Sequence, residues 1–223
     1  RDGGYHTHHV RQIPLVKTEN KNYLQELKHF DMPMVYGAVN AMQQTGFKVN
    51  KFVLQVLKDI WDSGISLPSL PPSENLPIPN KPHDIATNKQ AKINWKRNAV
   101  IIHTENNRMA SKRLLLRKTI QIADKFKDEK AIYMVYQLDF RGRIYAVPNY
   151  LNPQGTDFAK GLLLFSEAKK LNEQGACHLA IHGANMFGYD KSSLQERIDW
   201  VQDNQERILS CAKDPLSDLW WAK

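Results

Sequence analysis

Two arginines flank a glycine near the middle of the chain, in the sequence DFRGR at residues 139–143. The residues that follow suit a β-strand, and within a strand Arg141 and Arg143 would lie on the same face. A guanidinium stays charged and binds phosphate through two parallel hydrogen bonds, whereas burying one without a partner is very unfavourable. Gly142 would let another backbone approach closely. The pattern therefore indicates an anion site that could hold successive phosphates.

A structural alternative stays open for the same residues. Asp139 lies close enough in the chain to neutralise one arginine, and the pair could form ordinary salt bridges that only stabilise the fold. These five residues do not decide between phosphate binding and internal pairing.

The positive charge of the chain is concentrated around this motif. The 223 residues carry a formal net charge of +8, and residues 87–143 contain 14 Lys or Arg against 5 Asp or Glu, an excess of nine. The remainder is therefore close to neutral, and a local basic region of this kind indicates a polyanionic partner. There is no run of 18 apolar residues, so we expect no membrane partner.

A basic stripe precedes the motif. Its cations recur at helical spacings, with only Asp124 among them: Arg108, Lys112, Arg113, Arg117, Lys118 and Lys125. A solvated helix face is the alternative interpretation, but a face of nearly one sign favours nucleic acid.

Several other residues give weaker patterns. Lys160 could project from a helix start towards a phosphate, or could be a surface lysine. Asp139 and Asp157 could pair around a metal, but the neighbouring arginines would compete with the cation. The remaining candidates are two histidine groups and two isolated cysteines, none with a recognisable set of metal ligands or catalytic partners: His6, His8, His9, His178, His182, Cys177 and Cys211.

The proline-rich run at 66–82 divides two helical patterns, because proline lacks a backbone donor and favours extended geometry. Before it, apolar residues at spacings of three, four and seven predict one long helix from about 33 to 60, bent or weakened at Gly46. After it, residues 88–126 read as a helix with a possible break near Asn106. These helices would form an antiparallel projection with a basic edge.

From residue 131 the pattern changes to short strand-like runs, and helical patterns return at 172–187, 194–212 and 215–223. The predicted fold class is α+β and predominantly α.

The chain also resembles a known family, the single-subunit RNA polymerases of tailed bacteriophages. The resemblance rests on segments in matching order and spacing, of which DFRGR with its downstream partners is the most specific: MPMVYGAVNAMQQTGFKVNKFVL, ASKRLLLRKTIQIADKFKDEKAIY, DFRGRIYAV, NPQGTDFAKGLLLF, LAIHGANMFG, ERIDWVQDNQERI and PLSDLWWA.

This resemblance implies three parts: the end of an amino-terminal domain at 1–26, a thumb at 27–130 and the start of a palm at 131–223. It also implies contacts with the template strand and the RNA:DNA hybrid, from the DFRGR block, the T-D-F-A-K-G lysine and the basic thumb. The residues concerned are Asp139, Arg141, Gly142, Arg143, Lys160, Ser111, Lys112 and Arg113.

In the family, two palm aspartates hold two magnesium ions that align the reacting groups. The resemblance places these aspartates and the nucleotide-selecting helix after residue 223, so no catalytic or metal-binding residue is expected in this chain. The resemblance implies that the full-length protein is a monomeric DNA-directed RNA polymerase. It would use a DNA template and ribonucleoside triphosphates in the cytoplasm of an infected bacterium. The alternatives are one subunit of a split polymerase, a non-enzymatic nucleic-acid-binding module or, less favoured, a metal-binding domain.

Overall fold

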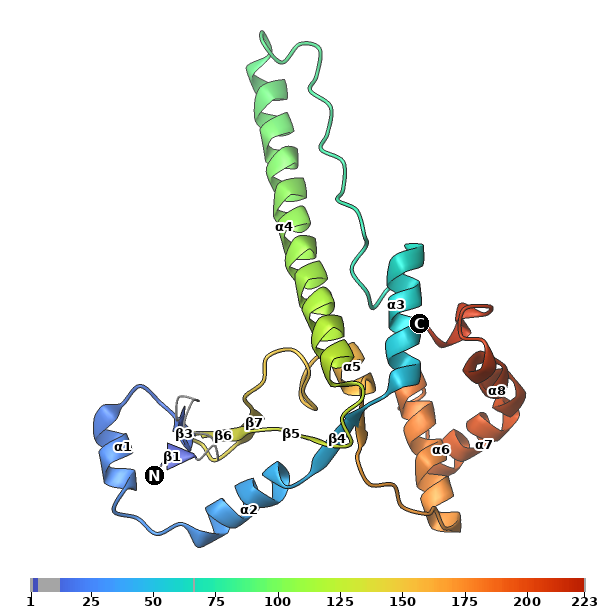
Figure 1. Ribbon diagram of the computed structural model, residues 1–223. Helices are drawn as coiled ribbons and strands as arrows, with labels where there is room; N and C mark the ends of the chain where they lie inside the picture. The colour runs from blue at the N-terminus through green and yellow to red at the C-terminus, as the bar shows by residue number, and fades with distance from the viewer. Residues whose placement is uncertain (1, 4–12, 66, 223) are drawn as a thin grey trace. The chain divides into compact units, whose positions relative to one another are not determined.

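The structure is a computed structural model that describes residues 2–3, 13–65 and 67–222 (Figure 1). It is predominantly helical with short strands, which confirms the predicted α+β class. The helices are α1 (Lys21–Leu27), α2 (Pro33–Gln43), α3 (Lys51–Ser63), α4 (Lys89–Phe126), α5 (Asp157–Gly161), α6 (Glu173–Phe187), α7 (Leu194–Asp203), α8 (Gln205–Lys213) and the 3-10 helix η1 (Leu219–Trp221). The strands are β1 (Asp2–Gly3), β2 (Ile13–Pro14), β3 (Val16–Lys17), β4 (Gly46–Val49), β5 (Ile132–Tyr133), β6 (Tyr136–Asp139), β7 (Ile144–Ala146) and β8 (Leu163–Phe165).

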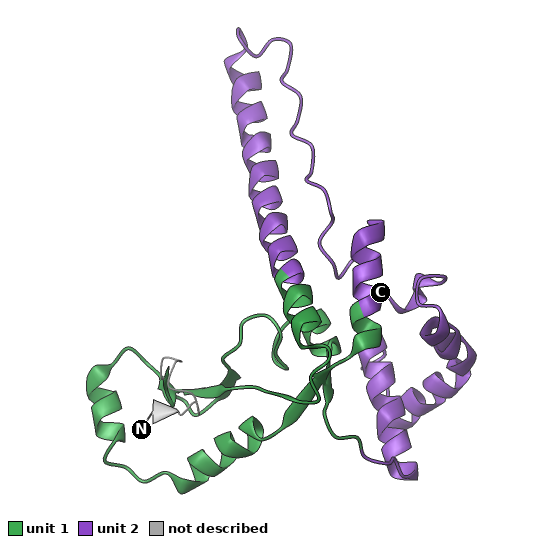
Figure 2. Cartoon of the chain, in the orientation of Figure 1, with its two compact units in different colours: residues 1–54, 118–168 green, residues 55–117, 169–223 purple. Residues whose placement is uncertain are grey.

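The chain divides into two compact units (Figure 2). Unit 1 comprises residues 1–54 and 118–168, and unit 2 comprises 55–117 and 169–223. These units are defined by contacts within the chain, so the expected division at residues 26 and 130 stays a prediction. Among the described residues, no helix has both the length and the apolar character needed to cross a lipid bilayer.

Unit 1 is built on two three-stranded sheets. In one, β6 lies between β3, which is parallel to it, and β7, which is antiparallel. Alternate residues of β6 are buried, as expected for a strand with one face in the core. The buried core combines residues from β3, α2, β4 and the β5–β6 region: Leu15, Val16, Val39, Phe47, Met134, Tyr136 and Leu138.

The predicted single helix over 33–60 is wrong. Residues 46–49 form β4, the central strand of the second sheet, between β5 and β8. Phe47 and Val49 point into the core, and a Cβ at Gly46 would lie 2.5 Å from the Ser166 hydroxyl oxygen. The strand forms because its partners, far away in sequence, bury one face and approach the glycine closely.

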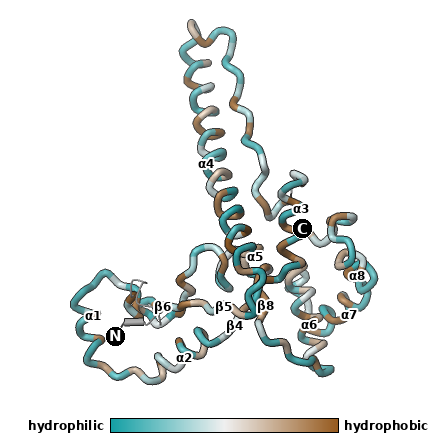
Figure 3. The backbone as a smooth tube through the Cα atoms, viewed as in Figure 1, coloured by the Kyte–Doolittle hydropathy of each residue, from teal (hydrophilic) through white to brown (hydrophobic). Residues whose placement is uncertain are grey.

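The possible helix break near Asn106 is also wrong, because α4 runs without interruption for 38 residues. An interior asparagine tends to compete for its own helix backbone, but the Asn106 side chain instead hydrogen-bonds the backbone of Leu76. By contrast, α3 covers 13 residues, so the described helices before and after the proline-rich run differ greatly in length. Figure 3 shows hydrophilic and hydrophobic residues interleaved along α4.

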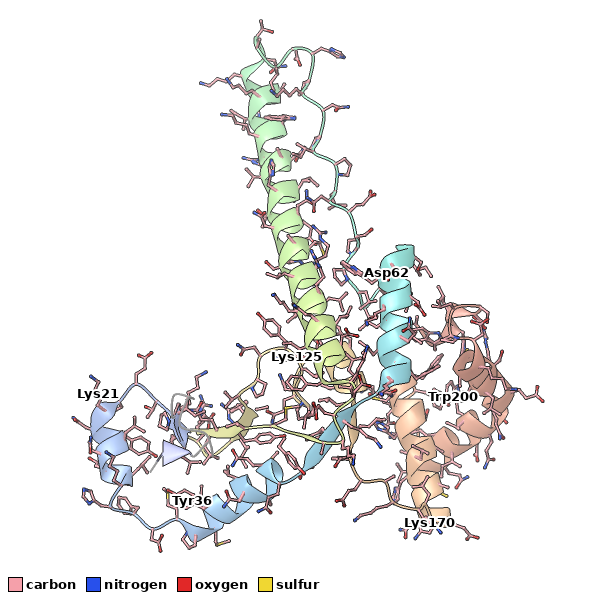
Figure 4. All side chains as sticks on the ribbon, in the orientation of Figure 1. Lys21, Tyr36, Asp62, Lys125, Lys170 and Trp200 are labelled. Atoms are coloured by element: carbon pink, nitrogen blue, oxygen red, sulfur yellow. The ribbon has the colours of Figure 1, made fainter. Side chains whose placement is uncertain are left out.

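Helices α6 to α8 pack around aromatic side chains in unit 2. Trp200 of α7 projects towards α6 (Figure 4), where its ring centre lies 4.7 Å from that of Phe187. Trp220 of η1 completes the cluster at 4.5 Å from Phe187. These aromatic contacts hold α6, α7 and η1 together.

Candidate nucleic-acid interface

The DFRGR residues form the turn of a hairpin between β6 and β7. The Asp139 amide donates to the Arg143 carbonyl at 2.9 Å, and the Gly142 amide donates to the Asp139 carbonyl at 3.0 Å. Gly142 has a φ of +80°, and these features match a type I turn followed by a glycine bulge. The arginines therefore lie in a turn, and the prediction that they share one strand face is wrong.

The glycine is required for its backbone conformation. Apart from Gly142 and its two chain neighbours, no heavy atom of the described residues lies within 4 Å of where a Gly142 Cβ would stand, so the predicted close approach of another backbone is not seen. A positive φ is readily adopted by glycine but costs other residues energy. Gly142 thus shapes the turn that presents both arginines.

Asp139 organises this turn through its carboxylate. One oxygen accepts from the backbone amides of Arg141 and Arg143, at 2.9 and 3.0 Å. The other accepts from the Arg143 guanidinium, at 2.8 Å from Nε and 2.7 Å from the terminal nitrogen. The Asp139 side chain is only 16% exposed. The structural salt bridge that the sequence left open is therefore present, and it involves Arg143.

These contacts shift the pKa values of both partners. Desolvation of Asp139 acts to raise its pKa, but the hydrogen bonds from Arg143 and Arg141 outweigh it and hold the pKa below its usual range. The side-chain hydrogen bond to Asp139, together with its charge, raises the pKa of Arg143. Both groups are thus charged at neutral pH.

Arg141 differs from Arg143 in its surroundings. Its guanidinium lies 5.3 Å from the centre of the Phe140 ring, and it makes no hydrogen bond or ion pair to any other side chain in the described part of the protein. Phe140 is itself 64% exposed. Arg143 also lies over a ring, 5.6 Å from the centre of Tyr145. The turn consequently presents one paired and one available guanidinium, each beside an aromatic ring.

Lys160 belongs to the same unit and lies on α5. Its ammonium contacts the Asp157 carboxylate at 3.0 Å, and both side chains are largely exposed. Asp139 and Asp157 are therefore each paired with a cation. Within the described residues, no three His, Cys, Asp or Glu side chains come close enough to hold a metal ion. His6, His8 and His9 lie outside the described residues.

A residue that the sequence analysis missed joins the hairpin to the loop before α5. The Gln154 carboxamide accepts from the Ala146 amide at 2.6 Å and donates to the Ile144 carbonyl at 2.9 Å, so it satisfies the outer edge of β7. Asn152 holds the same loop by bonding Pro148 and Gln154. The residue pattern of N-P-Q-G by itself indicates only a turn, because the backbone groups that the Gln154 side chain bonds lie in β7.

The three candidate residues on α4 have different environments in unit 2. The Ser111 hydroxyl donates to the Asn107 carbonyl of its own helix. Lys112 is exposed and has no hydrogen bond or ion pair within the described ranges. The Arg113 guanidinium donates to the carbonyls of Pro72 and Glu74, at 3.1 and 3.3 Å. Of the predicted site residues on this helix, Lys112 is the one with a free charge.

The comparisons with known proteins agree with the resemblance seen in the sequence. The family described as DNA-dependent RNA polymerase matches residues 169–223. The chain is 41% identical to the DNA-directed RNA polymerase of Enterobacteria phage T3 and 40% identical to T7 RNA polymerase of Escherichia phage T7, in both cases over 99% of this chain and 25% of the relative. A mitochondrial DNA-directed RNA polymerase of Neurospora crassa is 35% identical over 86% of this chain and 13% of its own length.

The chain thus spans about a quarter of the length of the phage relatives that it matches. The resemblance expected from the motifs is confirmed and covers the hairpin, α4 and the helices of unit 2. Along almost its whole length, this chain is similar to one segment of the phage-type, single-subunit DNA-directed RNA polymerases.

Proposed function

We propose that this chain is the segment of a phage-type DNA-directed RNA polymerase that holds the template strand and the RNA:DNA hybrid. The single observation that carries the proposal is the 41% identity to a phage polymerase over 99% of the chain. In the full-length protein, the proposed activity is nucleotidyl transfer from ribonucleoside triphosphates on a DNA template.

The hairpin supplies the proposed grip. The bonds to Asp139 fix the turn backbone and the Arg143 side chain, so both guanidinium groups are held in a defined region before nucleic acid arrives. Arg141 is the free cation and is proposed to bind a backbone phosphate, while Arg143 adds charge and orients the turn. Phosphate contacts of this kind position a strand without reading its sequence.

The other candidate residues offer phosphate ligands of the same chemical kind. Lys112 offers an exposed ammonium on α4, and the Lys160 ammonium can exchange its exposed partner Asp157 for a phosphate, because such surface pairs are weak. Ser111 could donate its hydroxyl to a phosphate by giving up its bond within the helix. Gly142 and Asp139 contribute through the shape of the turn.

Catalysis is proposed to need two magnesium ions held by residues of the full-length polymerase outside this segment. When bound, such ions supply charge stabilisation and alignment of the reacting oxygens. The residues described here contribute binding and orientation of the strands. By the same resemblance, the proposed site of action is the cytoplasm of an infected bacterium, and the proposed full-length protein is a monomer.

The test is binding of the chain to a labelled RNA:DNA hybrid over a range of salt concentrations. Each phosphate contact steepens the dependence of affinity on salt by about one unit in a log–log plot. We expect Arg141→Ala to flatten the slope by about one unit, and the Arg141→Ala/Arg143→Ala double variant to flatten it further, equally for hybrids of different sequence.

The matched control is the Lys169→Ala/Lys170→Ala variant, which removes two exposed lysines that lie just before α6. It should leave the slope close to that of the unmodified chain. If both double variants change the slope equally, the effect comes from net charge and the proposed grip by the hairpin is wrong.

A further inference from the structure

An extended segment lies along α4 and is held there by side chains of the helix. We call residues 67–82 the connector, which is the described part of the proline-rich run (Figure 1). The Trp95 indole donates to the Pro79 carbonyl at 2.8 Å. Further along the helix, Asn106 and Arg113 bond the connector at Leu76 and at residues 72–75.

The geometry of these three anchors is regular. They are separated by 11 and 7 residues, which are close to three and two turns, so they lie on one face of α4 and span about 27 Å along it. Between Pro79 and Pro72, an extended polyproline-type chain covers about 22 Å. The connector runs in the opposite direction to the helix, and the two lengths match within the reach of the side chains.

Hydrogen bonds dominate this contact. In the part of the connector that the three anchors hold, from Pro72 to Pro79, the apolar side chains of Leu76 and Ile78 are 45% and 47% exposed, so burial of these two side chains contributes little there. Asn106 is 9% exposed and pairs with both the amide and the carbonyl of Leu76, at 2.7 and 2.9 Å. An extended, proline-rich chain has no internal hydrogen bonds, which leaves its carbonyls available to the helix.

The amino-terminal part of α4 needs such support. Between residues 89 and 113, the residues with buried side chains are Ala99 and Asn106. A helix without a packed apolar face is only marginally stable in water. The connector lies along this exposed stretch and bonds three of its side chains.

We infer that the connector stabilises the helical conformation of the exposed part of α4, a role that we call a splint. Asn106 and Arg113 are then positioning residues. Arg113 directs its guanidinium to the connector, so it sets the shape of the helix that carries Lys112 and is not itself a phosphate ligand. This assignment differs from the role that the family resemblance implied for Arg113. The splint does not depend on the proposed function, whereas the statement about phosphate rests on it.

Hydrogen exchange of the whole chain, followed by mass spectrometry of its peptides, tests the splint. We expect Asn106→Leu and Trp95→Phe each to speed exchange in residues 89–113 by roughly tenfold, because each removes anchoring hydrogen bonds. Exchange in the hairpin at 136–146 should stay unchanged, which shows that the chain remains folded. Thr104→Ala is the control, since the Thr104 hydroxyl donates to the Val100 carbonyl of its own helix.

Unchanged exchange in 89–113 for the Asn106→Leu/Trp95→Phe double variant would overturn the splint. The second measurement concerns Arg113 and uses the salt dependence of hybrid binding. We expect Arg113→Ala to lower affinity several-fold with an unchanged slope, and Lys112→Ala to flatten the slope by about one unit.

A flattened slope for Arg113→Ala would assign Arg113 as a phosphate ligand and contradict its positioning role. If no hybrid binding is detected for any variant, the proposed function fails, and the exchange result still decides the splint. The two failures are therefore distinguishable.

Discussion

Asp139 determines how the two arginines of the turn differ. Its carboxylate accepts four N–H groups, two from the backbone and two from the Arg143 guanidinium. Every favourable direction around the carboxylate is then occupied, so Arg141 has to find its partner elsewhere. One acidic residue therefore both builds the turn and leaves a single guanidinium available for a ligand.

The lowered pKa of Asp139 makes the stability of the hairpin depend on pH. A carboxyl group whose pKa is lower in the folded state stabilises the fold above its unfolded pKa, which is about 3.9. This contribution disappears as the pH falls through the folded pKa. We expect the unfolding free energy of the chain to exceed that of an Asp139→Asn variant by a constant amount above about pH 5, and the difference to shrink below about pH 4.

Chemical denaturation at a series of pH values measures this difference directly. Other carboxylates with lowered pKa values, such as Asp128 and Glu196, affect both proteins equally and cancel. A difference that stays constant down to pH 3 would show that the charge of Asp139 does not stabilise the fold.

At the scale of elements, the hairpin turn depends on the left-handed conformation of Gly142. We expect Gly142→Ala to lower the unfolding free energy by about 1–2 kcal/mol, because a Cβ disfavours a positive φ. Asparagine visits this region more readily, so Gly142→Asn should cost less. Beyond its chain neighbours, no atom of the described residues lies within 4 Å of the new Cβ, so the effect would be conformational and not a clash.

Gly37 provides the opposite control for this prediction. It lies exposed within α2, without a positive φ and with open space around its Cα. Gly37→Ala should stabilise the chain by about 0.5–1 kcal/mol, since glycine inside a helix is unfavourable. Equal destabilisation by both substitutions in urea denaturation would contradict the conformational argument.

Elements with local signals could be predicted from the sequence. Helices α4 and α6 lie close to their predicted bounds, whereas the single helix predicted at 194–212 is divided at Asn204 into α7 and α8. The turn at 139–143 carries an Asp and a Gly where a type I turn with a glycine bulge needs them. The interpretation of the turn as a strand missed this signal. The salt bridge that the sequence left open as an alternative is the one that Arg143 forms with Asp139.

Elements with distant partners could not be predicted in the same way. Apolar residues on both sides of β4 keep a helical spacing, and β4 is a strand only because β5 and β8, more than 80 residues later, pair with it. Asn106 looked like a helix breaker because its partner, Leu76, lies 30 residues earlier. The role of Gln154 was hidden for the same reason, since only the fold brings it to the edge of β7.

At the scale of the whole molecule, the proposed task is binding and orientation of strands, without the chemical step. Two carboxylates beside candidate cations are already engaged, Asp139 with Arg143 and Asp157 with Lys160. Two-metal phosphoryl transfer needs carboxylates that are free to ligate both ions. The chain also spans only about a quarter of its phage relatives.

We therefore expect the chain alone to add no nucleotide to a primed hybrid in the presence of magnesium and all four ribonucleoside triphosphates, although it binds that hybrid. Gel analysis of a labelled RNA primer measures extension, and full-length T7 RNA polymerase, a relative of this chain, is the positive control under the same conditions. Binding without extension separates grip from catalysis. Extension that survives repeated purification and disappears in the Asp139→Asn/Asp157→Asn variant would contradict this division, because it would mean that carboxylates of this segment leave their cationic partners to bind the catalytic ions.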